Sequence, residues 1–354
     1  MSAPHLGSGT VVASKYSIRA LLAFHGATAT YQATDGQGAG VALKLLDPAI
    51  GQRADVMGEL ERVKAESAAL SRLGVLPVVD SGYDPATSAP FLVSEYMSIP
   101  SLARLLENGP LSEQVVQLIL QGMATALDAA HSRGLFHHCL KPTDVFVGPA
   151  PSYPVLVADF GARVVQAAVP SQEAYASAAP WLAPEQLHGA VTPSAHPDVY
   201  SVALIAFYAL TGRPYWLACQ SNPVDLPALQ QEALQPLVPL SRRAQELGRQ
   251  WNPALDAPLA RALAASPGER PASVGQLVQS MWPSAAPAAA LSAPQMSQPG
   301  YAPAPQPSTP GMMAPAASPQ LGAAGIPPDS ASAPPLVPGA APPAAGVEAA
   351  VPHP

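Results

Sequence analysis

The sequence is short of several features that mark particular classes of protein. Only two cysteines, Cys139 and Cys219, occur among its 354 residues, so no disulfide framework is expected and a reducing, cytoplasmic location is predicted. No cluster of Lys and Arg interleaved with aromatic residues is present, which argues against nucleic acid as a partner. The formal net charge of −7 is mildly acidic.

Long apolar runs are also missing. The longest lies near residues 200–210, Y-S-V-A-L-I-A-F-Y-A-L, and is too short to cross a bilayer. This run predicts a buried core helix. The N-terminus has no basic segment followed by an apolar one, so neither a secretory signal nor a membrane span is expected.

Composition divides the chain in two. Residues 283–354 contain 19 of the 44 prolines, no Lys or Arg, and only two charged side chains, Asp329 and Glu348. Such a segment buries too little apolar area to offset chain entropy, so a disordered Pro/Ala-rich tail with polyproline II bias is predicted. We expect one globular unit over residues 12–282, preceded by an N-terminal extension, residues 1–11.

Apolar periodicity predicts a strand-rich first part and a helical second part of this unit. The expected strands cover residues 16–22, 29–34, 41–46, 75–82 and 91–95, with one helix over 54–73. The pattern turns helical after residue 98, with a long amphipathic segment over 111–133 that ends at Gly134. Later helices are expected near 185–188, 195–212, 226–248, 253–264 and 272–281. The prediction is an α+β protein with a β-rich N-lobe, residues 12–97, and a helical C-lobe, residues 98–282.

Residues 134–147, G-L-F-H-H-C-L-K-P-T-D-V-F-V, form the most informative segment. It resembles the catalytic loop of protein Ser/Thr kinases, H-R-D-L-K-P-x-N followed by a short apolar strand. Lys141 matches the lysine of that pattern. Cys139 stands at the aspartate, His138 at the arginine and Asp144 at the asparagine. The resemblance implies that Cys139 occupies the position of the catalytic base and that Lys141 lies beside the transferred phosphoryl group.

Further motifs extend the resemblance to about residues 12–282 and imply a two-lobed kinase fold of the bacterial Ser/Thr kinase type. V-A-L-K, ending at Lys44, is similar to the strand lysine that contacts ATP phosphates. D-F-G, beginning at Asp159, implies a Mg²⁺ ligand, and Asp144 is a second candidate ligand. The segment around Glu95 and Met97 resembles the hinge, whose backbone meets the adenine edge.

The glutamate that pairs with the strand lysine is less clear from the sequence. Glu59, Glu61 and Glu66 compete for this role, and family spacing favours Glu66 if a His-Pro pair is deleted before residues 74–77. Two other matches concern the fold. Glu185 of A-P-E is expected to pair with Arg270, and residues 198–201 and 210–214 resemble the buried helix that anchors the C-lobe.

The nucleotide site departs from the family pattern at several positions. Ala23, His25 and Thr28 replace the glycines of the phosphate loop, and each Cβ restricts close backbone approach to phosphate. Phe146 replaces a smaller residue beneath adenine, and Thr30 replaces a valine above it. These changes predict weak or absent binding of ATP and Mg²⁺.

The base position and the activation segment also differ. A cysteine thiol of ordinary pKa is mostly protonated at neutral pH and is a poor proton acceptor. A positioned base typically contributes about 10²–10⁴ in rate. The activation segment, residues 162–181, has Ser177-Ala178-Ala179 where the family has Gly-Thr-Pro, and His138 removes the usual arginine partner of a phosphorylated segment. Control by segment phosphorylation is therefore not expected.

A zinc site is an alternative interpretation of the histidine-rich loop. His131, His137, His138 and Cys139 are ligand types for zinc. No second Cys or His pair has ligand spacing, and the resemblance assigns His137 to packing. The zinc interpretation is therefore disfavoured.

Three functions remain open. The first is a pseudokinase that binds a protein partner, such as another kinase or its substrate, and acts through conformation. The second is a weakly active Ser/Thr kinase that relies on Lys44, Asp159, Asp144 and Lys141 to position Mg-ATP. The third is a platform in which proline-rich stretches such as residues 303–307 bind a proline-recognising domain.

Overall fold

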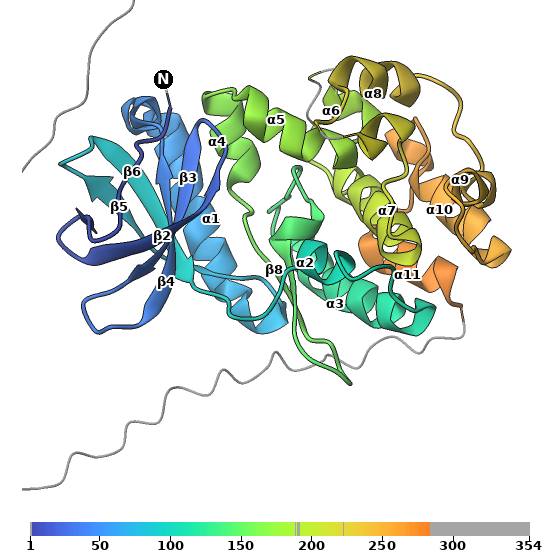
Figure 1. Ribbon diagram of the computed structural model, residues 1–354, viewed down its shortest axis with the longest axis horizontal. Coiled ribbons are helices and arrows are strands. Elements are labelled where there is room, and N and C mark those ends of the chain that lie inside the picture. Colours follow the sequence, from blue (N-terminus) through green and yellow to red (C-terminus); the bar gives the residue numbers. More distant parts are fainter. Residues whose placement is uncertain (1, 188, 190–191, 222, 284–354) are drawn as a thin grey trace, which may run out of the picture. The chain divides into compact units, whose positions relative to one another are not determined.

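A computed structural model describes residues 2–283 except 188, 190–191 and 222 (Figure 1). The predicted Pro/Ala-rich tail lies outside the described residues, apart from its first residue. Within them, a strand-rich N-lobe is followed by a helical C-lobe, so the predicted α+β two-lobed class is confirmed. No helix in this part of the chain is both long and apolar enough to cross a membrane.

The N-lobe contains one antiparallel sheet with the strand order β1-β2-β3-β4-β6-β5. Its strands are β1 (Val11–Val12), β2 (Tyr16–Phe24), β3 (Thr28–Thr34), β4 (Gly40–Leu46), β5 (Val78–Asp84) and β6 (Ala89–Glu95). The sequence predicted five of these strands and missed the two-residue β1.

Alternation along the strands gives the sheet two different faces. On one face, an apolar cluster of buried side chains includes Ala29, Tyr31, Leu43 and Val93. Chain segment 3–6 adds to that cluster: Ala3 is buried, and the backbone N–H of Leu6 donates to the Tyr31 hydroxyl at 2.9 Å. The predicted N-terminal extension is therefore packed against the sheet.

The other face of the sheet looks toward the C-lobe. Helix α1 (Ala54–Ala69) lies against it and buries Val56, Leu60, Val63 and Ser67, which are spaced to form one inward stripe. The helix ends at Ala69, earlier than predicted, and a short 3-10 turn follows before Gly74, whose φ is +90°.

The C-lobe is built around two helices with many buried residues. Helix α3 (Glu113–Ser132) begins at Ser112, whose side chain accepts from the Val115 N–H, and ends just before Gly134. Helix α7 (His196–Thr211) is apolar on all sides because it lies in the core, as predicted for residues 200–210. The remaining C-lobe elements are α2 (Leu102–Leu106), β7 (Val145–Val147), β8 (Val155–Val157), α4 (Ala162–Ala168), α5 (Gln172–Ala178), α6 (Pro184–Leu187), α8 (Leu226–Ala233), α9 (Leu240–Glu246), α10 (Asp256–Ala262) and α11 (Val274–Met281).

Two helices were not expected from the sequence. Helices α4 and α5 occupy the predicted activation segment, and Figure 1 shows them beside the N-lobe. Val165 of α4 is buried in an apolar cluster with Leu60 of α1 and Leu92 of β6. The segment therefore folds because its apolar residues pack against the N-lobe, which is a tertiary effect.

Candidate functional site

A cavity of about 600 Å³ lies between the two lobes. Eight of the nine residues predicted for the site line it: Lys44, Glu95, Met97, Cys139, Lys141, Asp144, Phe146 and Asp159. They come from β4, the end of β6, the loop before β7, β7 itself and the loop after β8. The ninth, Glu66, is not among the lining residues.

The Glu66 assignment was wrong, because this carboxylate forms an ion pair with Arg133 and not with Lys44. The stripe of α1 that faces the cavity carries Val63 and Ser67. The other two candidates are also engaged elsewhere: Glu59 pairs with Arg62, and Glu61 accepts from Ser81. The spacing Val56-Leu60-Val63-Ser67 was the sequence signal for the inward stripe, and it contains no acid.

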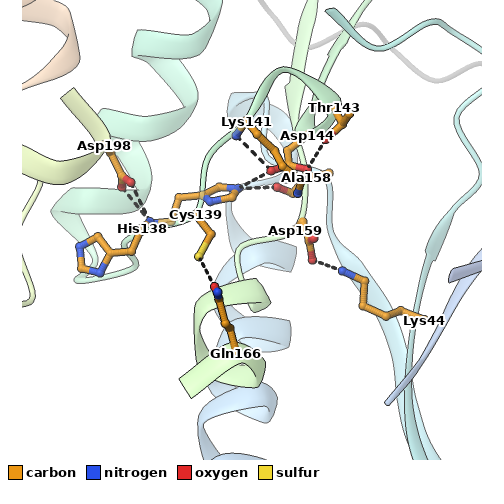
Figure 2. Close-up of polar contacts among 11 residues, drawn as sticks. Lys44, His138, Cys139, Lys141, Thr143, Asp144, Ala158, Asp159, Gln166 and Asp198 are labelled. Atoms are coloured by element: carbon orange, nitrogen blue, oxygen red, sulfur yellow. Dashed lines mark hydrogen bonds and ion pairs between the residues drawn. The ribbon is translucent and has the colours of Figure 1, made fainter. Parts of the chain in front are cut away.

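Lys44 forms its ion pair with Asp159 (Figure 2). Burial alone would raise the pKa of Asp159, but Lys44 and Lys141 outweigh it and hold that pKa below its usual value. The D-F-G aspartate is thus ionised and paired with the strand lysine. Asp159 has a φ of +68°, an uncommon conformation for a residue with a side chain.

Lys141 and Asp144 form a second pair in the same cavity. The Lys141 Nζ donates to Asp144 Oδ1 at 2.7 Å, and the backbone N–H of Lys141 donates to Oδ2 at 3.2 Å. Burial alone would lower the pKa of Lys141, but Asp144 and Asp159 outweigh it and raise that pKa. Two lysines and two carboxylates therefore balance each other's charge.

Cys139 is buried, with 4% of its surface exposed. Its Sγ lies 3.2 Å from Gln166 Oε1 and donates to it, so a residue of α4 contacts the base position directly (Figure 2). Burial raises the pKa of the Cys139 thiol to about 12. The group at this position is a neutral thiol that already donates its proton to Gln166, so it is a poor acceptor for the proton of a substrate hydroxyl.

The turn between β2 and β3, where the phosphate loop was predicted, contacts the activation segment. Ser171 Oγ, which caps α5, donates to the backbone carbonyl of His25 at 2.9 Å. An added Cβ on Gly26 would lie 2.4 Å from Ser171 Oγ, so the lack of a side chain at Gly26 permits this approach. Burial and then Lys141 and Lys44 lower the pKa of His25, which keeps its ring neutral near pH 7.

The four residues of the zinc interpretation are directed to separate partners. The His131 ring contacts Asp198 Oδ2 at 2.9 Å, the His137 ring contacts the Ala158 carbonyl at 2.8 Å, and the His138 ring contacts the Ser194 carbonyl at 2.9 Å. Among the described residues, no group of three or more His, Cys, Asp or Glu is arranged to hold a metal ion.

Asp198 supports the loop from beneath. Its carboxylate accepts the backbone N–H groups of His137 at 2.9 Å and His138 at 2.7 Å. These bonds hold His138 at a φ of +57°. Burial alone would raise the pKa of Asp198, but the interactions with His131, His138 and His137 lower it to about 2.

The predicted structural pair Glu185–Arg270 is confirmed. Arg270 donates through two nitrogens to the two carboxylate oxygens of Glu185, each at 2.7 Å. The Arg270 side chain is fully buried and also donates to the backbone carbonyl of Ala264 at 2.8 Å. This pair ties α6 to the segment before α11.

Sequence reasoning missed Ser94, which precedes the predicted hinge residue Glu95. Ser94 pairs with Ala42 across β4 and β6, and both side chains line the cavity. Thr30 and Phe146, which were predicted above and beneath adenine, line it too. The signal was a serine at a cavity-facing position of an otherwise apolar strand, F-L-V-S-E.

Comparisons with known proteins agree with this architecture. The kinase domain of Mycobacterium tuberculosis PknI superposes with a TM-score of 0.57 at 27% sequence identity, covering 78% of this chain and 98% of that one. A structure of Rad53 in complex with AMP-PNP superposes with a TM-score of 0.58 at 17% identity, which supports the fold alone.

Two curated relatives are bacterial kinases. The chain is 27% identical over 270 residues to serine/threonine-protein kinase PknB of Mycolicibacterium smegmatis, covering 73% of this chain and 41% of the relative. It is 33% identical over 207 residues to PknL of M. tuberculosis, covering 56% and 50%. The chain thus spans half or less of these relatives. A family model for the protein kinase domain matches residues 27–283, and the chain belongs to the protein kinase family.

Proposed function

We propose that this chain is a pseudokinase, a kinase-fold protein that acts in bacterial signalling by binding a protein partner. The observation that carries the proposal is the state of Cys139. A buried thiol with a pKa near 12, already donating to Gln166, offers no base at the position where the family has a carboxylate. The partner class we expect is another kinase or its substrate.

We expect only weak binding of Mg-ATP at this site. Carboxylate oxygens are suitable ligands for Mg²⁺, and Asp144 and Asp159 supply them. Each is held by a lysine, however, and the residues of α1 that line the cavity, Val63 and Ser67, include no glutamate for Lys44. The residues present therefore fit Mg-ATP poorly, and we derive no reaction step through it.

A weakly active kinase is the second candidate. It is favoured by one observation: Lys44, Lys141, Asp144 and Asp159 all line the same cavity. Positioning and electrostatic stabilisation contribute most of the rate enhancement of phosphoryl transfer. These four groups are therefore the ones that low activity would need.

One assay separates the two candidates. Transfer from labelled ATP to the chain itself and to a generic basic protein is measured for the wild type and for Lys44→Met. We expect no difference between them. Transfer that depends on Lys44 would establish the weakly active kinase. Binding is tested by thermal unfolding. If ATP binds weakly or not at all, millimolar ATP, with or without Mg²⁺, should raise the melting temperature by less than about 1 °C.

Restoring the base alone should not restore the enzyme. We expect Cys139→Asp to change transfer by less than about tenfold, far short of the contribution of a positioned base. The double variant Cys139→Asp with Val63→Glu returns a carboxylate to the α1 stripe that faces the cavity, and it should exceed the single variant. Strong rescue by Cys139→Asp alone would show that the other departures matter little.

The remaining parts of the proposal concern the rest of the chain. We assign the kinase-like domain to residues 12–282. We also propose that the protein is cytoplasmic. The tail after residue 282 is proposed as a spacer that also offers proline-rich stretches to a proline-recognising domain.

A further inference from the structure

Two segments that are far apart in the sequence hold the same turn of the N-lobe sheet. The turn joins β2 to β3, and Gly26 within it has a φ of +63°. The backbone N–H of Ala3, in the N-terminal segment of residues 3–6, donates to the carbonyl of Gly26 at 2.8 Å. The Ser171 hydroxyl donates to the preceding carbonyl, that of His25, at 2.9 Å. Neighbouring peptide groups of one turn therefore bind the N-terminal segment and the activation segment.

The N-terminal segment is attached to the sheet by side chains of β2 and β3. The Tyr31 hydroxyl donates to the Pro4 carbonyl at 3.0 Å and accepts the Leu6 N–H at 2.9 Å. The His5 ring lies against Phe24, the last residue of β2, with 4.3 Å between the ring centroids. These contacts fix the path of the segment along the sheet, up to the bond that it makes with the turn.

The same turn contacts both helices of the activation segment. Its bond to Ser171 involves the hydroxyl that caps the N-terminus of α5. The next residue of the turn, Ala27, is buried in the apolar cluster that contains Val165 of α4. A displacement of the turn would therefore weaken the contacts of α4 and α5 together. Because Gln166 of α4 is bonded to Cys139, the position of the turn also affects how firmly the base position is covered.

We propose that residues 3–6 act as a strap that positions the β2–β3 turn for the activation segment. With the strap in place, the turn is already fixed in the conformation that α5 binds. When the strap leaves the sheet, the activation segment alone has to order the turn, so the docking of α4 and α5 on the N-lobe weakens. The coupling is reciprocal, because both segments stabilise one conformation of the same turn. The strap therefore regulates access to Cys139, whether or not the chain transfers phosphate.

Amide hydrogen exchange of the full chain, measured by mass spectrometry on peptides that cover residues 171–178, tests the coupling. The variant Tyr31→Phe removes the hydroxyl that binds the strap and keeps the ring in the apolar cluster of the sheet. We expect exchange of α5 to become about threefold or more faster, because the strap loses two hydrogen bonds. Faster exchange of residues 3–6 with unchanged exchange of α5 would overturn the proposal.

Two controls separate this coupling from a general loss of stability. Tyr83→Phe makes the same change on β5, where the residue is 47% exposed, and should leave the exchange of α5 unchanged. Helix α11, which packs in the C-lobe core, is the internal reference, and an equal acceleration there would reject the coupling. Where Tyr31→Phe fails to give a cooperative melt, His5→Ala replaces it. His5 is exposed, and its removal from Phe24 should also accelerate exchange of α5; unchanged exchange would contradict the strap.

Reciprocity gives a second test in the opposite direction. Ser171→Ala removes the bond from α5 to the turn, so exchange of residues 3–6 should become about threefold or more faster. Ser112→Ala removes the corresponding cap of α3 and should leave exchange of residues 3–6 unchanged. Equal effects of the two variants on residues 3–6, or no effect of Ser171→Ala, would reject the strap.

Discussion

The two sides of the catalytic loop differ in how completely they retain the kinase pattern. Beneath the loop, Asp198 receives two backbone N–H groups and the His131 ring, and Glu185 and Arg270 form the expected bidentate pair. On the side facing the cavity, Cys139 is a protonated thiol and Lys44 lacks its helix glutamate. The supporting side is intact, and the chemical side is altered.

This difference shows that the fold and the chemistry depend on different residues. An unpaired buried carboxylate or guanidinium destabilises the folded state strongly, so changes beneath the loop would cost the fold itself. Replacing a carboxylate by a neutral thiol at Cys139 removes a charge from a buried site, and the fold tolerates it. The altered residues are those whose loss the fold tolerates.

The strongest way to break the comparison is Asp198→Ala. This change leaves two buried N–H groups without an acceptor, so we expect a loss of about 3–5 kcal/mol in the free energy of unfolding. The measurement is denaturant unfolding. Asp225→Ala, which removes an ordinary helix cap, is the control and should lose about 1 kcal/mol. Equal losses of unfolding free energy would mean that the hydrogen bonds of Asp198 stabilise the fold no more than an ordinary helix cap does.

A second test uses the Glu185–Arg270 pair. Arg270→Met leaves the carboxylate of Glu185 without its partner and should lower the free energy of unfolding by about 3 kcal/mol. The double variant with Glu185→Leu removes both charges and should recover part of this loss, as measured by the same denaturant titration. A double variant as unstable as the sum of the two single changes would rule out direct coupling.

The decrease in the free energy of unfolding at low pH sharpens the comparison. The pKa of Asp198 is lowered from 3.8 to about 2, so its contribution is fully present above the ordinary pKa and declines as pH falls toward 2. Between about pH 5 and pH 2, we expect the wild type to lose about 2 kcal/mol more than Asp198→Asn. Parallel pH profiles of unfolding free energy would contradict the assignment.

The smallest expected effect is that of Glu66→Ala. Glu66 and Arg133 are both partly exposed, so removal of this ion pair should cost less than about 1 kcal/mol. Val63→Ala is the matched change on the inward stripe and should destabilise more, by about 1–2 kcal/mol. A larger loss with Glu66→Ala than with Val63→Ala would contradict the placement of Glu66 outside the inward stripe.

Much of the fold could be predicted because its signals are local. The loose alternation in β2, the apolar run of β4 and the continuous apolar run in α7 were visible in the sequence, and the structure has those elements there. The helices α4 and α5 could not be predicted in this way. Their apolar residues find a partner only when the N-lobe is present, as Val165 does with Leu60 and Leu92.

The sequence predicted most of the selected residues that line the cavity, but it did not predict the ion pairs between them. The motifs brought eight of nine predicted residues to the cavity, because each motif has a defined place on a strand or loop. Motif spacing did not predict that Lys44 pairs with Asp159, nor that Ser94 and Ala42 lie opposite each other and line the cavity. Those facts depend on which side chains face each other across strands and lobes.

The sequence by itself determined that the chain has a kinase-like loop without the usual carboxylate, because residue identity at Cys139 is a property of the chain alone. It also determined the supporting residues Asp198, Glu185 and Arg270. Only the tertiary structure decided the protonation state of the Cys139 thiol, since burial against α4 raises its pKa to about 12. The same structure decided that the two lysines of the cavity are paired, because ion pairing depends on distances that only the packed lobes establish.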